Sequence, residues 1–170
     1  KMNGNIVFML LAPLSSLEVY IAFLGAAILR GLITGGSVLL IASLLVDVEI
    51  YSVGLILLFA LLASGVLGAL GIIAGIWSEK YDHLSAFQNF IILPLTFLSG
   101  VFFSIQGLSP FWQQVSAWNP VFYLIDGFRY GFLGVSDVPY LQSVWVALLF
   151  LVMLTGISVA ILRSGYKLRG

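Results

Sequence analysis

Cysteine is absent from the 170-residue chain, and histidine occurs only once. The lack of cysteine excludes disulfide bonds, thiolate metal sites and cysteine catalysis within these residues. The single histidine, His83, lies beside Asp82 in a short polar segment, and the sequence holds neither a Gly-x-Ser-x-Gly motif nor a cluster of metal-ligating residues. Hydrolysis inside a membrane needs an activated nucleophile or paired carboxylates. We therefore expect no enzyme activity, no metal and no cofactor.

Charged side chains are also scarce. Lys and Arg number seven, Asp and Glu number seven, and together they make up 8% of the chain, whereas 61% is hydrophobic. In soluble domains about a quarter of the residues are charged, because the surface must be solvated. Most of this surface must instead face lipid or other protein, so the sequence predicts an all-α, polytopic transmembrane bundle. The net charge of zero gives no indication of a nucleic-acid partner.

Long apolar runs predict the membrane-spanning helices. A helix needs roughly 20 apolar residues to cross a hydrocarbon core of about 30 Å. Pro94 frees a backbone carbonyl inside one of these runs and predicts a kink there. We expect residues 1–170 to form a single transmembrane domain. Its four predicted spans are residues 27–46, 53–77, 85–105 and 141–162.

The distribution of Lys and Arg predicts the orientation, because the cytoplasmic ends of membrane helices are enriched in both. We expect both ends of the chain to be cytoplasmic and residues 106–140 to lie outside. The cytoplasmic side then collects Lys1, Lys80, Arg163, Lys167 and Arg169. The outer side holds Arg129 together with Asp47, Glu49 and Asp137.

The residues before the first span predict a short amphipathic helix at the cytoplasmic face. Pro13 and the pair Ser15–Ser16 form a helix start signal, and Glu18 follows near the positive end of the helix dipole. This helix either anchors the chain at the interface or docks a cytoplasmic partner. Arg30, about one turn inside the first span, either snorkels to the interface or lines a substrate path. The apolar stripe of this helix consists of Leu14, Leu17, Ile21, Leu24 and Ile28.

Small residues recur every four positions in the first two spans. Lipid gives no hydrophobic drive for helix association, so close packing in a membrane uses small side chains. The sequence therefore predicts that both spans have helical neighbours. The rows are Ala27, Gly31 and Gly35 in the first span, and Ala60, Ser64, Gly68, Gly71 and Gly75 in the second.

Residues 106–140 are rich in aromatic side chains and predict two short helices rather than a polar loop. Ser109 caps the first helix and Pro110 begins it, while Asn119 and Pro120 do the same for the second. Each helix is too short to cross, so we expect a re-entrant hairpin at the outer interface. The apolar faces are Phe111, Val115 and Trp118 in the first helix, and Val121, Leu124, Ile125 and Phe128 in the second.

Two charges stand inside this aromatic hairpin, and Gly134 ends its second helix. Asp126 and Arg129 are three residues apart, so they lie on one turn and can pair with each other. An ion pair, with each other or reaching another helix, is tolerable where two isolated charges are not. The pair either fixes the hairpin or contacts the substrate directly. A purely mutual pair predicts that a double charge swap retains activity.

The order of these motifs resembles the C-terminal part of the type 2 ABC transporter permeases, the bacterial ABC-2 membrane subunits. The resemblance is carried by "QNFIILPLTFLSGVFFSIQGLSPFWQQVSAWNPVFYLIDGFRYGFLG", residues 88–134, and covers nearly the whole chain. The stretch "APLSSLE" similarly resembles the short cytoplasmic coupling stretch of that family. Members usually have six membrane helices and an N-terminal elbow helix. This chain therefore looks like a permease without its elbow helix and first two membrane helices.

The resemblance implies an exporter subunit in the bacterial inner membrane. Two copies, most simply a homodimer, form the pathway, and a separate cytoplasmic ABC ATPase drives transport. The residues implied in ATPase coupling are Pro13, Ser15, Ser16 and Glu18, with a second contact at Glu79 and Lys80. The outer hairpin implied as the lid of the pathway contains Trp112, Trp118, Asn119, Pro120, Tyr123, Asp126 and Arg129.

The sequence gives only indirect indications of the energy source and of the transported substrate. A phosphate-binding loop needs Gly-x-x-x-x-Gly-Lys-[Ser/Thr], and none of the lysines, Lys1, Lys80 and Lys167, has that context. Energy must therefore come from a partner. The uniformly apolar spans favour an amphipathic or lipid-like substrate within the membrane lipid. The alternative is a membrane scaffold or channel subunit without ATP coupling, and an ABC ATPase encoded beside this chain would favour the exporter.

Overall fold

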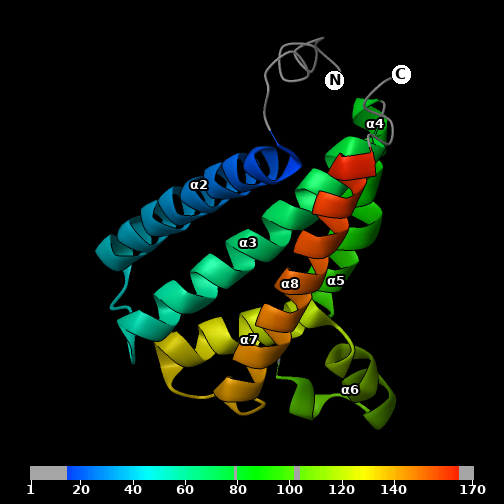
Figure 1. Ribbon diagram of the computed structural model, residues 1–170. Helices are drawn as coiled ribbons and strands as arrows, with labels where there is room; N and C mark the ends of the chain where they lie inside the picture. Colours follow the sequence, from blue (N-terminus) through cyan, green and yellow to red (C-terminus); the bar gives the residue numbers. More distant parts are fainter. Residues whose placement is uncertain (1–14, 79, 102–103, 165–170) are drawn as a thin grey trace.

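The computed structural model of the chain describes residues 15–78, 80–101 and 104–164, and over these residues it is built of helices without a β-strand (Figure 1). The predicted all-α class is confirmed. The elements are α2 (Ser16–Leu45), α3 (Val53–Trp77), α4 (Tyr81–Phe87), the π-helical turn η1 (Gln88–Ile92), α5 (Leu93–Phe97), the 3-10 turn η2 (Ile105–Gly107), α6 (Pro110–Ala117), α7 (Pro120–Leu133) and α8 (Tyr140–Ser164).

The central helix of the bundle is α3, which packs against α2, α7 and α8. Phe59, Val66 and Ala69 of α3 are fully buried in the core. The start of α2 and the end of α8 lie at one end of the bundle, whereas α6 and α7 lie at the opposite end (Figure 1). The core cluster consists of Phe59, Leu62, Val66 and Ala69 of α3, Leu124 of α7, and Ala147 and Leu154 of α8.

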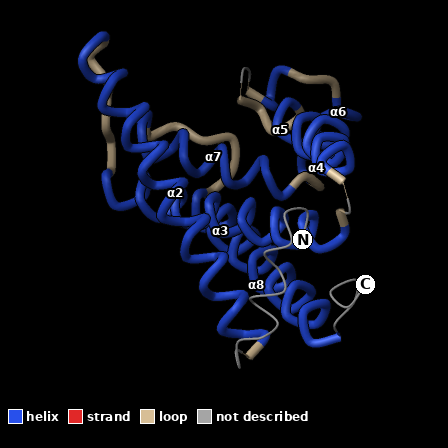
Figure 2. Tube along the Cα trace, turned by 90° about the horizontal axis from the view of Figure 1, so that it is seen from above, coloured by secondary structure: helices blue, strands red, loops and turns tan. Residues whose placement is uncertain are grey.

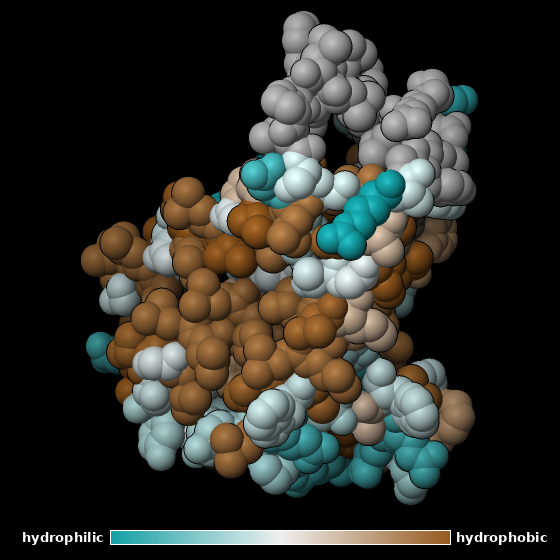
Figure 3. Space-filling view, in the orientation of Figure 1, coloured by the Kyte–Doolittle hydropathy of each residue, from teal (hydrophilic) through white to brown (hydrophobic). Residues whose placement is uncertain are grey.

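Three of the described helices, α2, α3 and α8, are long and apolar enough to cross a membrane. Hydrophobic residues form a broad band across the middle of the molecule, and hydrophilic residues gather around the end that carries the hairpin (Figure 3). Many large apolar side chains within the band are exposed, as Leu44 and Leu45 are at 78% each. A lipid environment removes the cost of exposing these side chains to water. The chain is therefore a multi-pass membrane protein.

The predicted amphipathic helix and first span form one continuous helix, α2, of 30 residues. Its predicted stripe matches the packed face at Leu24 and Ile28, which lie against α3 and the core, but not at Leu17 and Ile21, which are 46% and 58% exposed. Tyr20, between them, is buried instead. Near the start of this helix, the packed side therefore follows Tyr20 rather than the predicted stripe. Pro13 and Leu14 lie outside the described residues.

The third predicted span, residues 85–105, differs most from expectation. The helical segment runs from Tyr81 to Phe97 through α4, η1 and α5, so it starts earlier and ends sooner than predicted. Pro94 cannot donate a backbone hydrogen bond, and the π turn lies directly before it, as expected for a helix irregularity at proline. Seen from above, this segment lies to one side of α3 and α8 (Figure 2). It contributes no residue to the main core cluster.

The small-residue rows of α2 and α3 pack against each other over part of their length, so both helices have the helical neighbours that were predicted. A Cβ atom added at Gly31 would lie 2.3 Å from Ser64 Oγ, and one added at Gly68 would lie 2.8 Å from Ala27 Cβ. Such contacts leave no room for a larger side chain. By contrast, Gly35, Gly71 and Gly75 have nothing within 4 Å.

Candidate functional site at the α6–α7 hairpin and the start of α2

The helices of the hairpin begin and end where the sequence predicts. Asn119 Oδ1 accepts a hydrogen bond from the Val121 amide at 3.0 Å, which caps α7. Gly134 ends α7 with a φ of 67°, a left-handed conformation that favours glycine. Ser109 stands at the cap position of α6, but its side chain makes no cap hydrogen bond there.

Two glycines of α7 let it approach α3 closely. A Cβ atom at Gly127 would lie 2.0 Å from the ring of Phe59, and one at Gly131 would lie 2.9 Å from the backbone nitrogen of Ile56. Residues four apart share a helix face, so these two glycines form one contact surface. The face of α7 is therefore buried against the bundle, and Tyr123 and Asp126 are buried with it. The apolar stripe predicted for α7 is confirmed at Val121 and Leu124, which are buried, but not at Phe128, which is 37% exposed.

The charge network at the hairpin contains three residues rather than the predicted two. Arg129 Nη2 lies 2.6 Å from Asp126 Oδ1, which confirms the predicted ion pair. The same nitrogen lies 2.7 Å from Oδ2 of Asp137, in the connection between α7 and α8. Asp126 is 1% exposed and Arg129 is 25% exposed. The two carboxylates share one guanidinium, which compensates part of their desolvation.

Both carboxylates of this network also accept other hydrogen bonds. Asp126 accepts from the backbone amides of Asp137 at 2.8 Å and Val138 at 3.3 Å. Asp137 accepts from Ser104 Oγ at 2.5 Å and from the Ile105 amide at 3.1 Å. The network therefore ties together three segments: the start of η2, the middle of α7 and the connection to α8. This arrangement holds the hairpin in place.

The environment of the network shifts the pKa of two of its groups. Burial acts to raise the pKa of Asp137, but hydrogen bonds from Ser104, Arg129 and Ile105 and the charge of Arg129 outweigh it, so this pKa lies below its usual range. Burial acts to lower the pKa of Arg129, and the two carboxylates outweigh it, so this pKa is raised. Both groups are therefore held in their charged forms.

Contacts between tyrosine rings connect α7 to neighbouring segments at the hairpin end of the bundle. The rings of Tyr130 in α7 and Tyr140 at the start of α8 stack with centroids 5.1 Å apart and planes 4° apart. The ring of Tyr51, in the connection between α2 and α3, is tilted by 60° to that of Tyr130, with the ring centroids 5.5 Å apart. The Tyr51 amide donates to the Phe132 carbonyl at 3.0 Å, and the Ser52 amide to the Gly131 carbonyl at 2.8 Å. These bonds satisfy carbonyls that the end of α7 leaves without a helical partner.

Helix α6 is attached to the bundle by side-chain hydrogen bonds to backbone carbonyls. Ser116 Oγ donates to the Leu98 carbonyl at 3.0 Å, and Tyr123 OH donates to the Ala117 carbonyl at 2.9 Å. Trp112 and Trp118 lie on the outside, 45% and 88% exposed. Tryptophan favours the interface between lipid and water, so this exposure fits a helix at the level of the headgroups.

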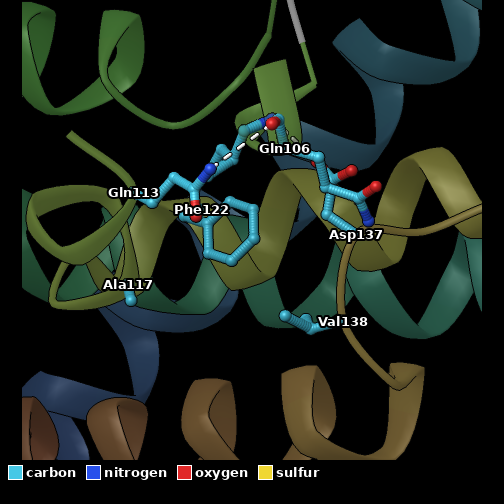
Figure 4. A pocket seen from close by; sticks show the side chains of 7 residues that line it. Gln106, Gln113, Ala117, Phe122, Asp137 and Val138 are labelled. Carbon is cyan, nitrogen blue, oxygen red and sulfur yellow. Dashed lines mark hydrogen bonds between the residues drawn. The ribbon is translucent and has the colours of Figure 1, made fainter. Parts of the chain in front are cut away.

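A small cavity of about 200 Å³ lies beneath α6, between η2, α7 and the α7–α8 connection (Figure 4). Gln113 Nε2 crosses its upper side to donate to the carbonyls of Gln106 at 3.3 Å and Leu108 at 2.9 Å. Its volume exceeds that of a cavity of about 150 Å³ that binds benzene, so it is of the size of a small molecule. The lining residues are Ile105, Gln106, Gln113, Ala117, Phe122, Asp137 and Val138.

At the opposite end of the bundle, α2 begins with a capping box. The Ser15 amide donates to Glu18 Oε2 at 2.7 Å, and the Glu18 amide donates to Ser15 Oγ at 3.2 Å. Ser16 is the first residue of α2. The box is exposed, so its side chains are available to a partner. It satisfies two of the amides that a helix start leaves unpaired.

Lys80, from the second predicted coupling contact, is not brought to this box. Lys80 is exposed at the start of α4. The helices α2 and α4, both within the described part of the chain, do not contact each other. Pro13 and Glu79 lie outside the described residues. Among the described residues, no group of three or more His, Asp or Glu side chains is arranged to hold a metal ion.

Sequence reasoning missed two features of the hairpin. It noted Asp137 as an outer acidic residue but gave it no partner, because its contact with Arg129 depends on how the connection to α8 folds back. It also passed over the pair Gly127 and Gly131, although the Gly-x-x-x-Gly spacing in "GFRYG" signals close helix packing. That spacing was the available signal for the α3–α7 contact.

Comparisons with known proteins place this architecture in a family. The family model described as "ABC-2 type transporter" matches residues 1–133. The chain is 34% identical over 169 residues to the inner membrane transport permease YadH of Escherichia coli K12, covering 99% of this chain and 66% of that protein. It is also 30% identical over 117 residues to nodulation protein J of Rhizobium leguminosarum bv. viciae, covering 66% of this chain and 45% of that protein. No solved structure matches the chain.

The chain therefore belongs to the ABC-2 type transporter family. This confirms the family that the motifs from Gln88 to Gly134 predict. The chain spans about two thirds of the length of the permease YadH that it resembles.

Proposed function

We propose that this chain is part of the permease of an ATP-driven ABC exporter in the bacterial inner membrane. A second copy completes the pathway, and a separate cytoplasmic ATPase supplies the energy. The observation that carries the proposal is the polarity of the bundle. An exposed capping box, Ser15 to Glu18, stands at one end, and a hairpin fixed by three charges stands at the other. A permease needs a contact for the ATPase at its cytoplasmic end and a lid at its outer end, and the capping box and the hairpin stand at opposite ends of the bundle.

The proposed topology has four crossings with both chain ends in the cytoplasm. Besides α2, α3 and α8, the segment from Tyr81 to Phe97 is the fourth. At 1.5 Å per residue its helix is about 25 Å long, close to the thickness of the hydrocarbon core. Its exposed apolar side chains, such as Phe90 at 80%, support a lipid or protein environment along its length.

In the proposed mechanism, the start of α2 receives the motion of the ATPase. The hairpin of α6 and α7 covers the outer end of the pathway, with Trp112 and Trp118 at the headgroup level. An amphipathic or lipid-like substrate suits this arrangement, because the described surface between the two ends is mainly apolar (Figure 3).

Co-purification with an ATPase tests the proposal. The full-length permease, tagged and co-expressed with an ABC ATPase encoded beside it, should retain that ATPase through purification. Glu18→Ala should retain several-fold less, because it removes both the charge and half of the capping box. Glu18→Gln is the matched control for the cap, since glutamine at this position still accepts the Ser15 amide bond. If both variants retain less ATPase, docking depends on the charge of Glu18. If only Glu18→Ala retains less, docking depends on the capped start of the helix.

Two results count against the proposal. The first is that no ATPase is retained by the unsubstituted protein. The second is that Glu18→Ala retains as much ATPase as the unsubstituted protein does.

A further inference from the structure

Tyr20 joins the start of α2 to α8. Among the residues of α2, all of which the structure describes, Tyr20 alone is buried, with 1% of its surface exposed. Its hydroxyl lies 2.7 Å from Thr155 Oγ1 of α8. Thr155 Oγ1 donates its single proton to the Leu151 carbonyl at 2.8 Å, so Tyr20 is the donor in the bond between the two helices.

The position of Tyr20 along α2 gives this bond its importance. Tyr20 lies five residues after Ser15 and therefore about one turn inside the exposed capping box. The packed part of α2 continues to Gly31, which faces Ser64 of α3. Beyond it, Gly35 has nothing within 4 Å, and the end of α2 is exposed. The half of α2 next to the box is thus the half that the bundle holds.

Thr155 is connected to the outer hairpin by one uninterrupted helix. From Thr155 back to Tyr140, α8 runs for 15 residues, or about 22 Å. At that end Tyr140 stacks on Tyr130 of α7, and the preceding amide of Val138 donates to Asp126. A displacement of α8 along its axis therefore acts on the network that holds the hairpin.

We infer that Tyr20 is a positioning residue that makes the start of α2 and α8 move as one body, so that an ATPase contact at the capping box reaches the outer hairpin through α8. The inference rests on the proposed ATP-driven function. A phenol hydroxyl buried among apolar groups needs a hydrogen-bond partner, and the partner that Tyr20 uses belongs to α8 rather than to its own helix. The bond is therefore directed between helices.

The experiment follows the hairpin directly and needs no known cargo. Within residues 1–170 the absence of cysteine permits a single label, placed by Gln114→Cys on the exposed side of α6, with any cysteine elsewhere in the full-length protein changed to serine. The labelled permease, purified with its ATPase in lipid nanodiscs, carries an environment-sensitive fluorophore. The measurements are the fluorescence change on addition of ATP and the rate of ATP hydrolysis.

Tyr20→Phe should reduce the ATP-driven fluorescence change by about threefold to tenfold, the range expected for one hydroxyl bond between membrane helices. The amount of bound ATPase and the hydrolysis rate should remain. Thr155→Val should have the same effect, and Thr155→Ser should restore the response because it keeps the hydroxyl. Thr34→Val, which removes a hydroxyl at an exposed position of the same α2 helix, is the matched control and should respond fully.

The outcomes separate the inference from the function on which it rests. If the labelled parent complex shows no response to ATP, the proposed ATP-driven function fails. If the parent responds and Tyr20→Phe responds equally, the role of Tyr20 is overturned while the function stands. If Thr155→Ser loses the response as fully as Thr155→Val does, the hydrogen bond is not the cause and the inference is again overturned. The Thr155 variants also decide the question if Tyr20→Phe does not assemble.

Discussion

Replacement of Asp126 by alanine should destabilise the protein more than any loss of a single exposed charge. The carboxylate accepts three hydrogen bonds, from Arg129 and from the amides of Asp137 and Val138. Each buried amide left without a partner costs about 1–3 kcal/mol. Removing one member of a buried ion pair costs about 3–5 kcal/mol. Arg129 is partly exposed and retains its ion pair with Asp137. We therefore expect the free energy of unfolding to fall by an amount near the lower limit, about 3 kcal/mol.

The assay is thermal unfolding of the purified full-length protein in detergent, followed by intrinsic fluorescence. A loss of 1 kcal/mol lowers the Tm by roughly 2–4 °C for a domain of 150–250 residues, so Asp126→Ala should lower it by about 6–12 °C. Glu49→Ala, which removes an exposed acidic side chain on the same predicted side, is the control and should change the free energy of unfolding by less than about 0.5 kcal/mol.

The double swap of Asp126→Arg with Arg129→Asp gives the sharper test. A purely mutual pair, one of the two arrangements that the sequence left open, predicts that the swap recovers stability. The observed network predicts that it does not, because arginine has no acceptor for the amides of Asp137 and Val138. If the swapped protein unfolds at the temperature of the unsubstituted protein, the hydrogen bonds to these amides do not hold the hairpin and the reasoning is refuted.

Two further predictions follow from the hairpin contacts. Gly127→Ala should lower the free energy of unfolding by about 1–3 kcal/mol, because its Cβ meets the fully buried ring of Phe59, whereas Gly71→Ala, whose Cβ meets nothing within 4 Å, should not lower it in the same melting assay. Equal melting of both variants would contradict the close α3–α7 contact. The pKa of Asp137 is lowered in the folded state, so its stabilisation is complete above the usual aspartate pKa of about 3.9 and is lost as the pH falls through the lower folded value. Between about pH 5 and pH 3 the protein should therefore lose more stability than Asp137→Asn does, and parallel losses would refute this.

The boundaries of several helices could be predicted from the sequence because local chemistry sets them. Val53–Trp77 matches its predicted span, and α7 begins at Pro120 after its Asn119 cap, as predicted. Gly134 ends that helix in the left-handed conformation. A proline, a cap side chain and a glycine each act within one turn of the chain, so their effect is visible without the fold.

What could not be predicted depends on contacts between distant segments. The burial of Tyr20 needs α8 beside α2, and its partner Thr155 is 135 residues away. The bond between Arg129 and Asp137 needs the connection after α7 to fold back over that helix. The predicted stripe was wrong at Leu17 and Ile21 but right at Leu24 and Ile28. Apolar side chains in a membrane protein are as stable against lipid as against protein, so hydrophobic periodicity alone does not identify the packed face.

The most direct measurement is the accessibility of two single cysteines to a membrane-impermeant maleimide in intact bacterial cells. The account places α6 outside and α4 in the cytoplasm, so Gln114→Cys should be labelled in intact cells and Asp82→Cys only after the membrane is permeabilised. Both positions are exposed on the protein itself. Labelling of Asp82→Cys in intact cells, with Gln114→Cys protected until permeabilisation, would place the hairpin on the cytoplasmic side and contradict the account.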